Sequence, residues 1–188
     1  MKLNRSPRAV FLVGFMGAGK SRAGRALARL LGWSFVDLDR RVEGREGRSI
    51  AQIFRKSGEA AFRRAETAAL RELLGEMKES PGSVVALGGG VPAQAENRKR
   101  LGARGLVTVF LDVPVKTLWE RCRGGQGKRP LVKDEESFRR LYGARRRHYA
   151  GAGIRVKATE RSPKELAAEI AEKLGFTPRS GRKNQERT

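Results

Sequence analysis

Eight residues near the N-terminus have the types and spacing of a phosphate-binding loop. Gly14–Ser21 reads GFMGAGKS and matches the pattern G-x-x-x-x-G-K-[ST]. Such a loop points its backbone N–H groups at phosphate oxygens, and the helix that follows adds its positive N-terminal end. We expect Lys20 to reach the β- and γ-phosphates of a nucleotide and the Ser21 hydroxyl to lie on Mg²⁺. The alternative is a glycine turn that carries Lys and Ser without binding a nucleotide.

Two carboxylates come next along the chain. Asp37 and Asp39 lie at the end of the apolar run Ser34–Leu38. If that run is a strand, alternation turns both side chains to the same side. One carboxylate near Mg²⁺ and a second near an acceptor hydroxyl would suit phosphoryl transfer, whereas the pair taken alone could be a solvated strand end.

Arginines and glycines complete the set of residues that could do chemistry. Arg63 and Glu66 are three residues apart on a predicted helix, a spacing usual for a surface salt bridge. Gly88–Gly90 follow a predicted buried strand and indicate a close approach by a ligand or another backbone, hence the floor of a pocket. Arg129 and Arg145 add rigid guanidinium groups, which suit carboxylates and phosphates.

Alternating apolar runs and amphipathic segments would hold these residues in place. Strands are predicted at Arg8–Val13, Ser34–Leu38, Ser83–Leu87, Leu106–Leu111 and Ile154–Ala158. Helices are predicted at Ser21–Leu31, Ser49–Phe54, Glu59–Glu79, Val115–Arg123, Phe138–Tyr149 and Ser162–Leu174. Arg123–Pro130 shows no periodicity and is predicted to be a mobile loop. Apolar strands separated by helices predict an α/β fold with a parallel sheet covered on both faces.

Composition limits the class of protein. A chain of 188 residues with 39% hydrophobic residues is long enough for one domain with one core. A single cysteine, Cys122, excludes an internal disulfide framework and indicates a cytoplasmic protein. The apolar run Ala9–Met16 is too short for a membrane span and leads into Lys20, so we do not expect a signal peptide. The 41 Lys and Arg against 20 Asp and Glu give a net charge of +21, which implies an anionic partner: a nucleic acid or a small charged substrate.

Taken in order along the chain, these motifs resemble the shikimate kinase family. The matching segments are Gly14–Ser21, Asp37 with Asp39, Gly47-Arg48-Ser49-Ile50, Phe62-Arg63-Arg64-Ala65-Glu66, Gly88–Gly90, Arg129-Pro130-Leu131, and Arg145 with Tyr149. The resemblance runs from about Val10 to Leu174. The phosphate loop alone is shared with many kinases and GTPases, whereas the ordered set is specific.

The resemblance implies a fold and a reaction. The fold would be a three-layer α/β/α sandwich of the P-loop NTPase class with a five-stranded parallel sheet. Residues 1–175 would form one domain, with an acceptor-binding region at about 36–72 and a mobile lid at about 121–136, followed by a basic, disordered tail at 176–188. The reaction would be ATP plus shikimate giving ADP and shikimate 3-phosphate, on the route to chorismate and the aromatic amino acids. We expect Mg²⁺ as cofactor, a cytoplasmic monomer, and no membrane or specific nucleic-acid partner.

The resemblance also implies roles for single residues. Lys20, Asp39 and Arg129 would be catalytic, and Ser21 with Asp37 would hold the metal. Asp39 would also bind the acceptor hydroxyl. The remaining substrate-binding residues would be Arg63 and Arg145, which grip the carboxylate, and Gly88, Gly89 and Gly90, which line the ring. The nucleotide-binding residues would be Gly17, Ala18, Gly19, Lys20, Ser21, Arg22, Arg123 and Arg129, with Arg121 as a rival to Arg123 for the adenine contact.

Three other functions remain open from the sequence. A related small-molecule kinase, such as a gluconate kinase, would use the same loop on another hydroxyl. Arg63 with Arg145 argues against a neutral sugar and for an acceptor that carries a carboxylate. A basic nucleic-acid-binding protein would fit the charge, yet aromatic residues make up only 6% of the chain and form no stacking stripe. An ATP-binding protein without transferase activity is disfavoured by the presence of Lys20, Asp39 and Arg129.

Overall fold

The fold was taken from a computed structural model of the chain, which describes residues 7–77, 82–103, 106–123 and 134–176. Arg129, most of the predicted lid and residues 177–188 of the predicted tail lie outside the described residues. Phe176, at the end of the described part, packs its ring edge-on against Trp33, with 5.4 Å between the ring centroids.

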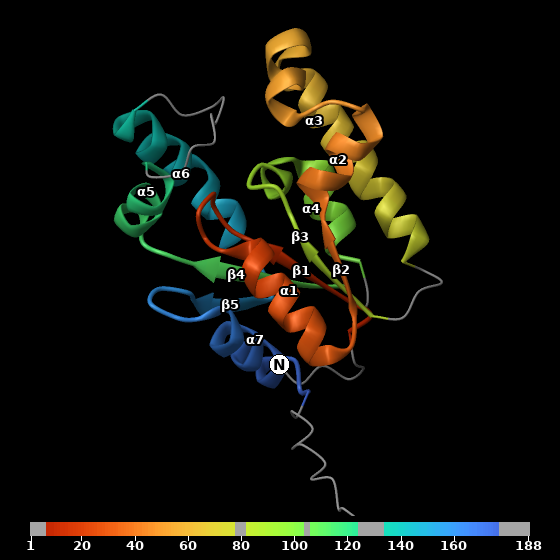
Figure 1. Ribbon diagram of the computed structural model, residues 1–188, viewed down its shortest axis with the longest axis vertical. Coiled ribbons are helices and arrows are strands. Elements are labelled where there is room, and N and C mark those ends of the chain that lie inside the picture. Colours follow the sequence, from red (N-terminus) through yellow and green to blue (C-terminus); the bar gives the residue numbers. More distant parts are fainter. Residues whose placement is uncertain (1–6, 78–81, 104–105, 124–133, 177–188) are drawn as a thin grey trace, which may run out of the picture.

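Five parallel strands form the sheet at the centre of the molecule (Figure 1). They are β1 (Ala9–Val13), β2 (Ser34–Asp37), β3 (Ser83–Ala86), β4 (Leu106–Asp112) and β5 (Ile154–Lys157), in the spatial order β2-β3-β1-β4-β5. Every residue of β1 is buried, as expected for the central strand of a sheet covered on both faces. Leu12 of β1 pairs with Ala86 on one side and with Val109 on the other. The α/β fold predicted from the sequence is confirmed.

Helices cover the sheet and project beyond it. They are α1 (Lys20–Leu31), α2 (Leu38–Glu46), α3 (Ile50–Glu76), α4 (Ala95–Leu101), α5 (Val115–Arg123), α6 (Glu135–Tyr149) and α7 (Pro163–Lys173), with a 3₁₀ turn η1 at Val91–Ala93. Helices α1 and α7 pack against each other, while α5–α6 and α2–α3 lie at the upper left and upper right of Figure 1. Within the described part of the chain, no helix combines the length and apolar composition needed to cross a membrane.

Long α3 contains the break that the sequence placed between two helices. Gly58 has φ 77° and ψ 174°, which are not helical values and which glycine adopts most readily. The helix begins at Ser49, whose hydroxyl accepts from the Gln52 N–H while the Gln52 side chain accepts from the Ser49 N–H. This reciprocal capping box confirms Ser49 as the predicted N-cap.

Helix α2 corrects the interpretation of Asp39. Asp37 is the last residue of β2, and its Oδ1 accepts a hydrogen bond from the Asp39 N–H at 3.2 Å, so Asp37 caps a helix that begins at Leu38. Asp39 therefore lies in the first turn of α2, and the argument from strand alternation was wrong for it. The helix was missed because Leu38 and Val42 are its buried residues, too few to show a helical period.

Other elements also differ from the prediction. Helix α6 begins three residues earlier than Phe138, because the Asp134 carboxylate caps it by accepting from the Ser137 N–H at 2.7 Å. The 3₁₀ turn η1 and helix α4 were not predicted. Both lie in the segment that follows Gly88–Gly90.

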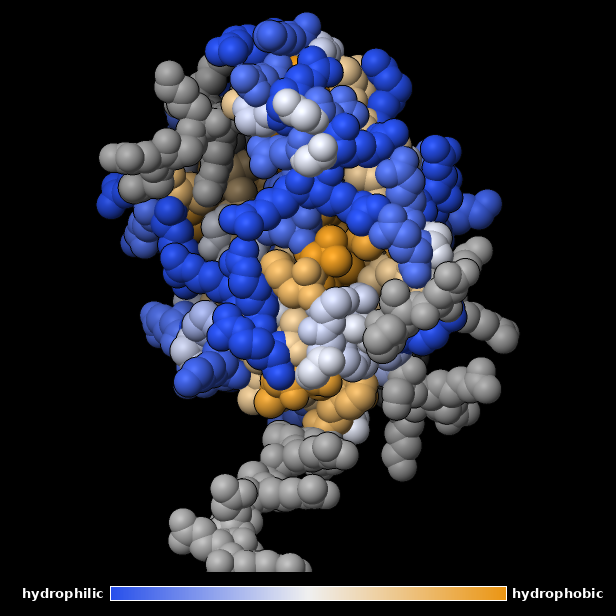
Figure 2. Space-filling view, turned by 45° about the vertical axis from the view of Figure 1, so that its right-hand side comes forward, coloured by the Kyte–Doolittle hydropathy of each residue, from blue (hydrophilic) through white to orange (hydrophobic). Residues whose placement is uncertain are grey.

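The surface is strongly polar. Figure 2 shows hydrophilic residues over most of one face, with a smaller apolar area near its centre. Within the described residues, Leu30 is the large apolar side chain that is clearly exposed, at 44%. This surface agrees with the high content of Lys and Arg.

Candidate active site

The phosphate loop connects the carboxyl end of β1 to α1. Gly14, Gly17 and Gly19 have φ values of 147°, 82° and 88°, which side-chain-bearing residues rarely adopt. Phe15 anchors the loop to α6. Its buried ring packs edge-on against Phe138 and Tyr142, with 5.0 and 5.4 Å between the ring centroids. Helix α1 has no acidic residue in its first turn and no side-chain cap at Gly19. Its positive N-terminal end is thus open to an anion.

A cavity of about 680 Å³ lies over this loop and is large enough for a nucleotide. Lys20 lines it and donates to the carbonyl oxygens of Gly14 and Phe15 at 2.9 and 3.0 Å. Arg22 and Arg121 also line it, and Arg121 Nη1 donates to the Gly17 carbonyl at 3.4 Å. Arg123 is exposed and does not line this cavity, so Arg121 lies closer to the nucleotide site than its rival.

Ser21 and Asp37 form a pair of oxygen ligands that lines the large cavity. Ser21 Oγ donates to Asp37 Oδ2 at 2.7 Å, across the junction between α1 and β2. Mg²⁺ in phosphate-transferring sites usually takes one or two protein oxygens and completes its shell with water and substrate phosphates. One hydroxyl and one carboxylate beside the phosphate loop therefore fit the ion expected from the sequence.

A second cavity of about 180 Å³ adjoins the first. Its lining combines apolar side chains with charged groups: Met16, Asp39, Ile50, Phe54, Phe62, Arg63, Glu66, Gly88, Gly89, Gly90 and Arg145. Met16, Asp39 and Gly89 line both cavities. The small cavity suits a compact apolar ring that carries polar substituents and a negative charge.

Asp39 lies where the two cavities meet. Burial raises the pKa of its carboxyl above the ordinary value, and the positive charge of Lys20 offsets part of that effect. A carboxylate with a raised pKa is a better proton acceptor, since its basicity lies closer to neutral pH. This position and this basicity suit a group that binds a reacting hydroxyl.

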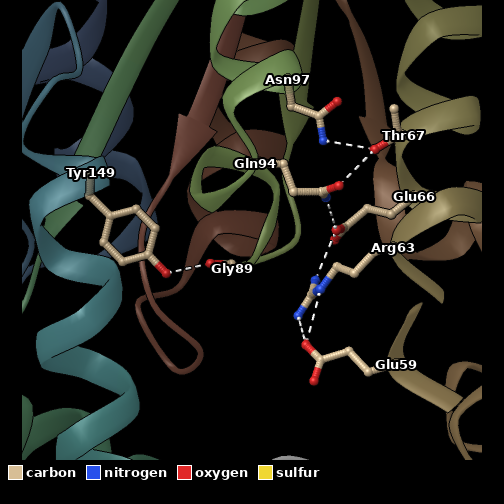
Figure 3. Close-up of polar contacts among 8 residues, drawn as sticks. All are labelled: Glu59, Arg63, Glu66, Thr67, Gly89, Gln94, Asn97 and Tyr149. Atoms are coloured by element: carbon tan, nitrogen blue, oxygen red, sulfur yellow. Dashed lines mark hydrogen bonds and ion pairs between the residues drawn. The ribbon is translucent and has the colours of Figure 1, made fainter. Parts of the chain in front are cut away.

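Arg63 is held from two sides by carboxylates (Figure 3). Its Nε and Nη2 donate to Glu59 Oε1 at 3.2 and 2.9 Å, and its Nη1 donates to Glu66 Oε2 at 2.9 Å. Burial alone would lower the pKa of Arg63, but the two carboxylates reverse the direction and raise it. Three of the five N–H groups of the guanidinium are used, so one remains on each terminal nitrogen. The pairing with Glu66 is no surface salt bridge, because the Glu66 side chain is only 1% exposed.

Arg145 faces the same cavity from α6. It is buried, its guanidinium lies 5.9 Å from the centre of the Phe15 ring, and burial lowers its pKa. The neighbouring Tyr149 donates its hydroxyl to the Gly89 carbonyl at 2.5 Å, which ties α6 to the glycine segment. The structure thus brings Arg63 and Arg145, 82 residues apart in sequence, to one small cavity.

The three glycines make room for charged side chains of the site. A Cβ at Gly88 would lie 2.5 Å from Glu66 Oε1 and 2.7 Å from Asp39 Oδ1, and a Cβ at Gly90 would overlap Arg63 Nη1. Gly89 has more space, with the Tyr149 hydroxyl nearest at 3.4 Å. The close approach predicted for these glycines is therefore made by protein side chains of the site itself.

Some residues of the site were not identified from the sequence. Arg161, Pro163 and Leu166, after β5, line the far end of the large cavity. The sequence marked Ser162 and Pro163 only as a helix start, and nothing in it places that start beside the phosphate loop. Glu59, which pairs with Arg63, was also missed, although its i,i+4 spacing to Arg63 was a usable signal.

A parallel sheet whose strand ends carry a phosphate loop, beside a second cavity for an acceptor, defines a P-loop phosphotransferase. Comparison with known proteins names the family. The model of the family described as shikimate kinase matches residues 16–175. A shikimate kinase of Thermus thermophilus is 44% identical over 177 residues, which cover 93% of this chain and 94% of the relative.

Solved structures agree with this match. A shikimate kinase from Acinetobacter baumannii in complex with shikimate has a TM-score of 0.82 and 35% identity, covering 90% of this chain and 93% of the other. The shikimate kinase from Aquifex aeolicus has a TM-score of 0.77 and 40% identity, covering 89% and 96%. The chain belongs to the shikimate kinase family, as predicted. Its activity is ATP-dependent phosphoryl transfer to an alcohol.

Proposed function

We propose that this chain transfers the γ-phosphate of ATP to the 3-hydroxyl of shikimate, giving ADP and shikimate 3-phosphate. The observation that carries the proposal is the position of Asp39, which lines both the large cavity over the phosphate loop and the small cavity with two arginines. A hydroxyl bound at Asp39 would face a phosphate bound at the loop. Membership in the shikimate kinase family supports the same substrate.

The nucleotide is proposed to bind in the large cavity. Loop N–H groups, the positive end of α1 and Lys20 would hold its phosphates. Ser21 and Asp37 would hold Mg²⁺, which when bound neutralises charge on the phosphate oxygens. Arg121 and Arg161, which line this cavity, would contact the nucleoside. Arg129, outside the described residues, would bring positive charge to the transferring group.

Shikimate is proposed to bind in the small cavity. The two N–H groups left on Arg63, together with Arg145, would grip its carboxylate, while Phe54 and Phe62 would pack against its ring. Asp39 would accept a hydrogen bond from the 3-hydroxyl and take its proton as the new O–P bond forms and the bond to ADP breaks. The negative charge then passes from the attacking oxygen to the leaving ADP, so the site needs positioning and cations more than covalent chemistry.

The shape of the small cavity separates shikimate from the alternative acceptor, gluconate. Gluconate also carries a carboxylate, but on a flexible open chain that would lose more conformational freedom in a cavity of about 180 Å³. We therefore expect the rigid ring acid to be the preferred acceptor. A cytoplasmic monomer without a specific nucleic-acid partner remains our expectation for the state in which the enzyme acts.

A coupled assay of ADP release tests the proposal. The chain would be mixed with ATP and Mg²⁺ and given shikimate, gluconate or no acceptor. We expect ADP release to require shikimate and to be much slower with gluconate. ADP release at the same rate in all three mixtures would contradict the proposal and indicate an ATPase with another acceptor.

A further inference from the structure

A chain of hydrogen-bonded polar side chains runs from the acceptor cavity along α3 to α4 (Figure 3). Glu66 and Asn97, at its two ends, are buried, whereas Thr67 and Gln94 between them are partly buried. The chain begins at Glu66, whose Oε2 accepts from Arg63 Nη1 at 2.9 Å and from Gln94 Nε2 at 3.1 Å. Gln94 Oε1 accepts from the Thr67 hydroxyl at 3.0 Å, and Thr67 Oγ1 accepts from Asn97 Nδ2 at 3.1 Å. These hydrogen bonds therefore join α3 to the start of α4.

The direction of these hydrogen bonds is fixed by the charge of Glu66. A carboxylate can only accept, so Gln94 must turn its NH₂ group toward Glu66 and its oxygen toward Thr67. Thr67 must then give its hydroxyl hydrogen to Gln94 and accept from Asn97. Every bond in the chain donates toward Glu66, which fixes the orientation of the carboxylate that holds Arg63.

None of the three outer residues belongs to the acceptor cavity. Thr67, Gln94 and Asn97 do not line it, whereas Glu66 and Arg63 do. Asn97 is completely buried, and its Oδ1 has no partner in the described structure. An unpaired buried polar atom destabilises a fold, so packing alone does not account for an asparagine at this position.

We propose that Gln94, Thr67 and Asn97 are positioning residues for the reaction. They would act through Glu66 to orient the Arg63 guanidinium, so that its two remaining N–H groups face the acceptor carboxylate. This proposal rests on the proposed function, because it needs an acceptor whose carboxylate binds Arg63. It assigns a role in acceptor affinity to residues that touch no substrate.

The test removes the central hydroxyl and changes the acceptor in the same experiment. Thr67→Val keeps the shape of the side chain and interrupts the hydrogen bonds, and Thr67→Ser keeps the hydroxyl. As a control, Thr108→Val removes a hydroxyl that lines neither cavity and accepts from the Gly153 N–H. Dissociation constants would be measured for shikimate, for its methyl ester, in which a neutral ester replaces the carboxylate, and for ATP.

We expect Thr67→Val to weaken shikimate binding about three- to ten-fold, the effect of one hydrogen bond. The same variant should change binding of the methyl ester and of ATP less than about two-fold. Thr67→Ser should restore shikimate affinity, and Thr108→Val should leave all three constants unchanged. Equal weakening of shikimate and its ester by Thr67→Val would overturn the proposal, since the chain would then act on the cavity as a whole.

Two controls separate the possible failures. If Thr67→Val no longer binds ATP, its fold is disturbed, and Gln94→Met, which removes the donor to Glu66 at the edge of α4, replaces it with the same expected pattern. A wild-type chain that binds ATP but neither binds nor phosphorylates shikimate would contradict the proposed function. A wild-type chain that phosphorylates shikimate, with Thr67→Val and Gln94→Met unaffected, would contradict the positioning role alone.

Discussion

Two carboxylates bind Arg63 at the same distance but differ in burial. We predict that burial decides how much the loss of each charge raises the KM for shikimate. Glu59 and Glu66 each lie 2.9 Å from a terminal nitrogen of Arg63, but the Glu59 side chain is 50% exposed and that of Glu66 is 1% exposed. The perturbations are Glu59→Gln and Glu66→Gln, which each remove one charge and keep the shape.

The expected magnitudes follow from the surroundings. An exposed i,i+4 pair contributes about 0.3–0.5 kcal/mol, so Glu59→Gln should raise the KM for shikimate about two-fold. A hydrogen bond to a charged group contributes about 1 to 1.5 kcal/mol more than a neutral one, and Glu66 is shielded from water. Glu66→Gln should therefore raise the KM for shikimate about five- to ten-fold.

Steady-state kinetics with shikimate and ATP varied separately would measure both effects. The KM for ATP should stay within about two-fold of wild type in both variants, because neither glutamate lines the large cavity. Equal effects of the two variants on the KM for shikimate would refute the reasoning from burial. So would an effect of Glu66→Gln on the KM for ATP of the same size as on shikimate.

Three further predictions concern the proposed catalytic carboxylate, the glycine segment and the tail. Asp39→Asn should lower kcat about 10²- to 10⁴-fold. In the wild type, kcat should fall as the pH drops through the raised pKa of Asp39, because protonation removes the base. If the pH–rate profile of Asp39→Asn shows the same fall at low pH, Asp39 is not that base. Gly88→Ala should lower the free energy of unfolding by about 1–3 kcal/mol, because its Cβ would collide with two carboxylates. Gly44→Ala in α2 has open space around it and should raise the free energy of unfolding by about 0.5–1 kcal/mol. Denaturant unfolding measures both changes. A chain that ends at Phe176 should keep kcat within about two-fold, since the residues removed carry almost no apolar side chains. A large loss of kcat in the ADP-release assay would show that the tail takes part in turnover.

Much of the site could be predicted because most of its residues belong to short sequence motifs. The phosphate loop has a fixed pattern between a strand and a helix, and the structure has this strand and this helix at the predicted places. Asp37 lines the same cavity as the loop residues. Arg63, Arg145 and the three glycines come together because they follow the carboxyl ends of strands or lie on helices that cover those ends. Asp39 lies beside the phosphate loop, but not for the predicted reason: it belongs to the first turn of a helix that Asp37 caps, and not to a strand.

What the sequence could not provide depends on neighbours that are distant along the chain. Glu66 is buried because the segment after β3 covers α3, and the hydrophobic periodicity of the sequence does not indicate this contact. Arg161 and Pro163 enter the nucleotide cavity only because β5 lies beside β4 at the sheet edge. The hydrogen bonds from Asn97 to Glu66 join helices α3 and α4, and the second of these was too short to predict.

In the proposed reaction, phosphate passes from the large cavity to a hydroxyl held at Asp39 in the small one. The most direct measurement is ³¹P–¹H correlation NMR of the product formed from ATP and shikimate. We expect a single phosphate ester, on the 3-hydroxyl of the ring, and none in the Asp39→Asn variant on the same time scale. A phosphate on another hydroxyl, or inorganic phosphate as the main product, would contradict the proposed reaction.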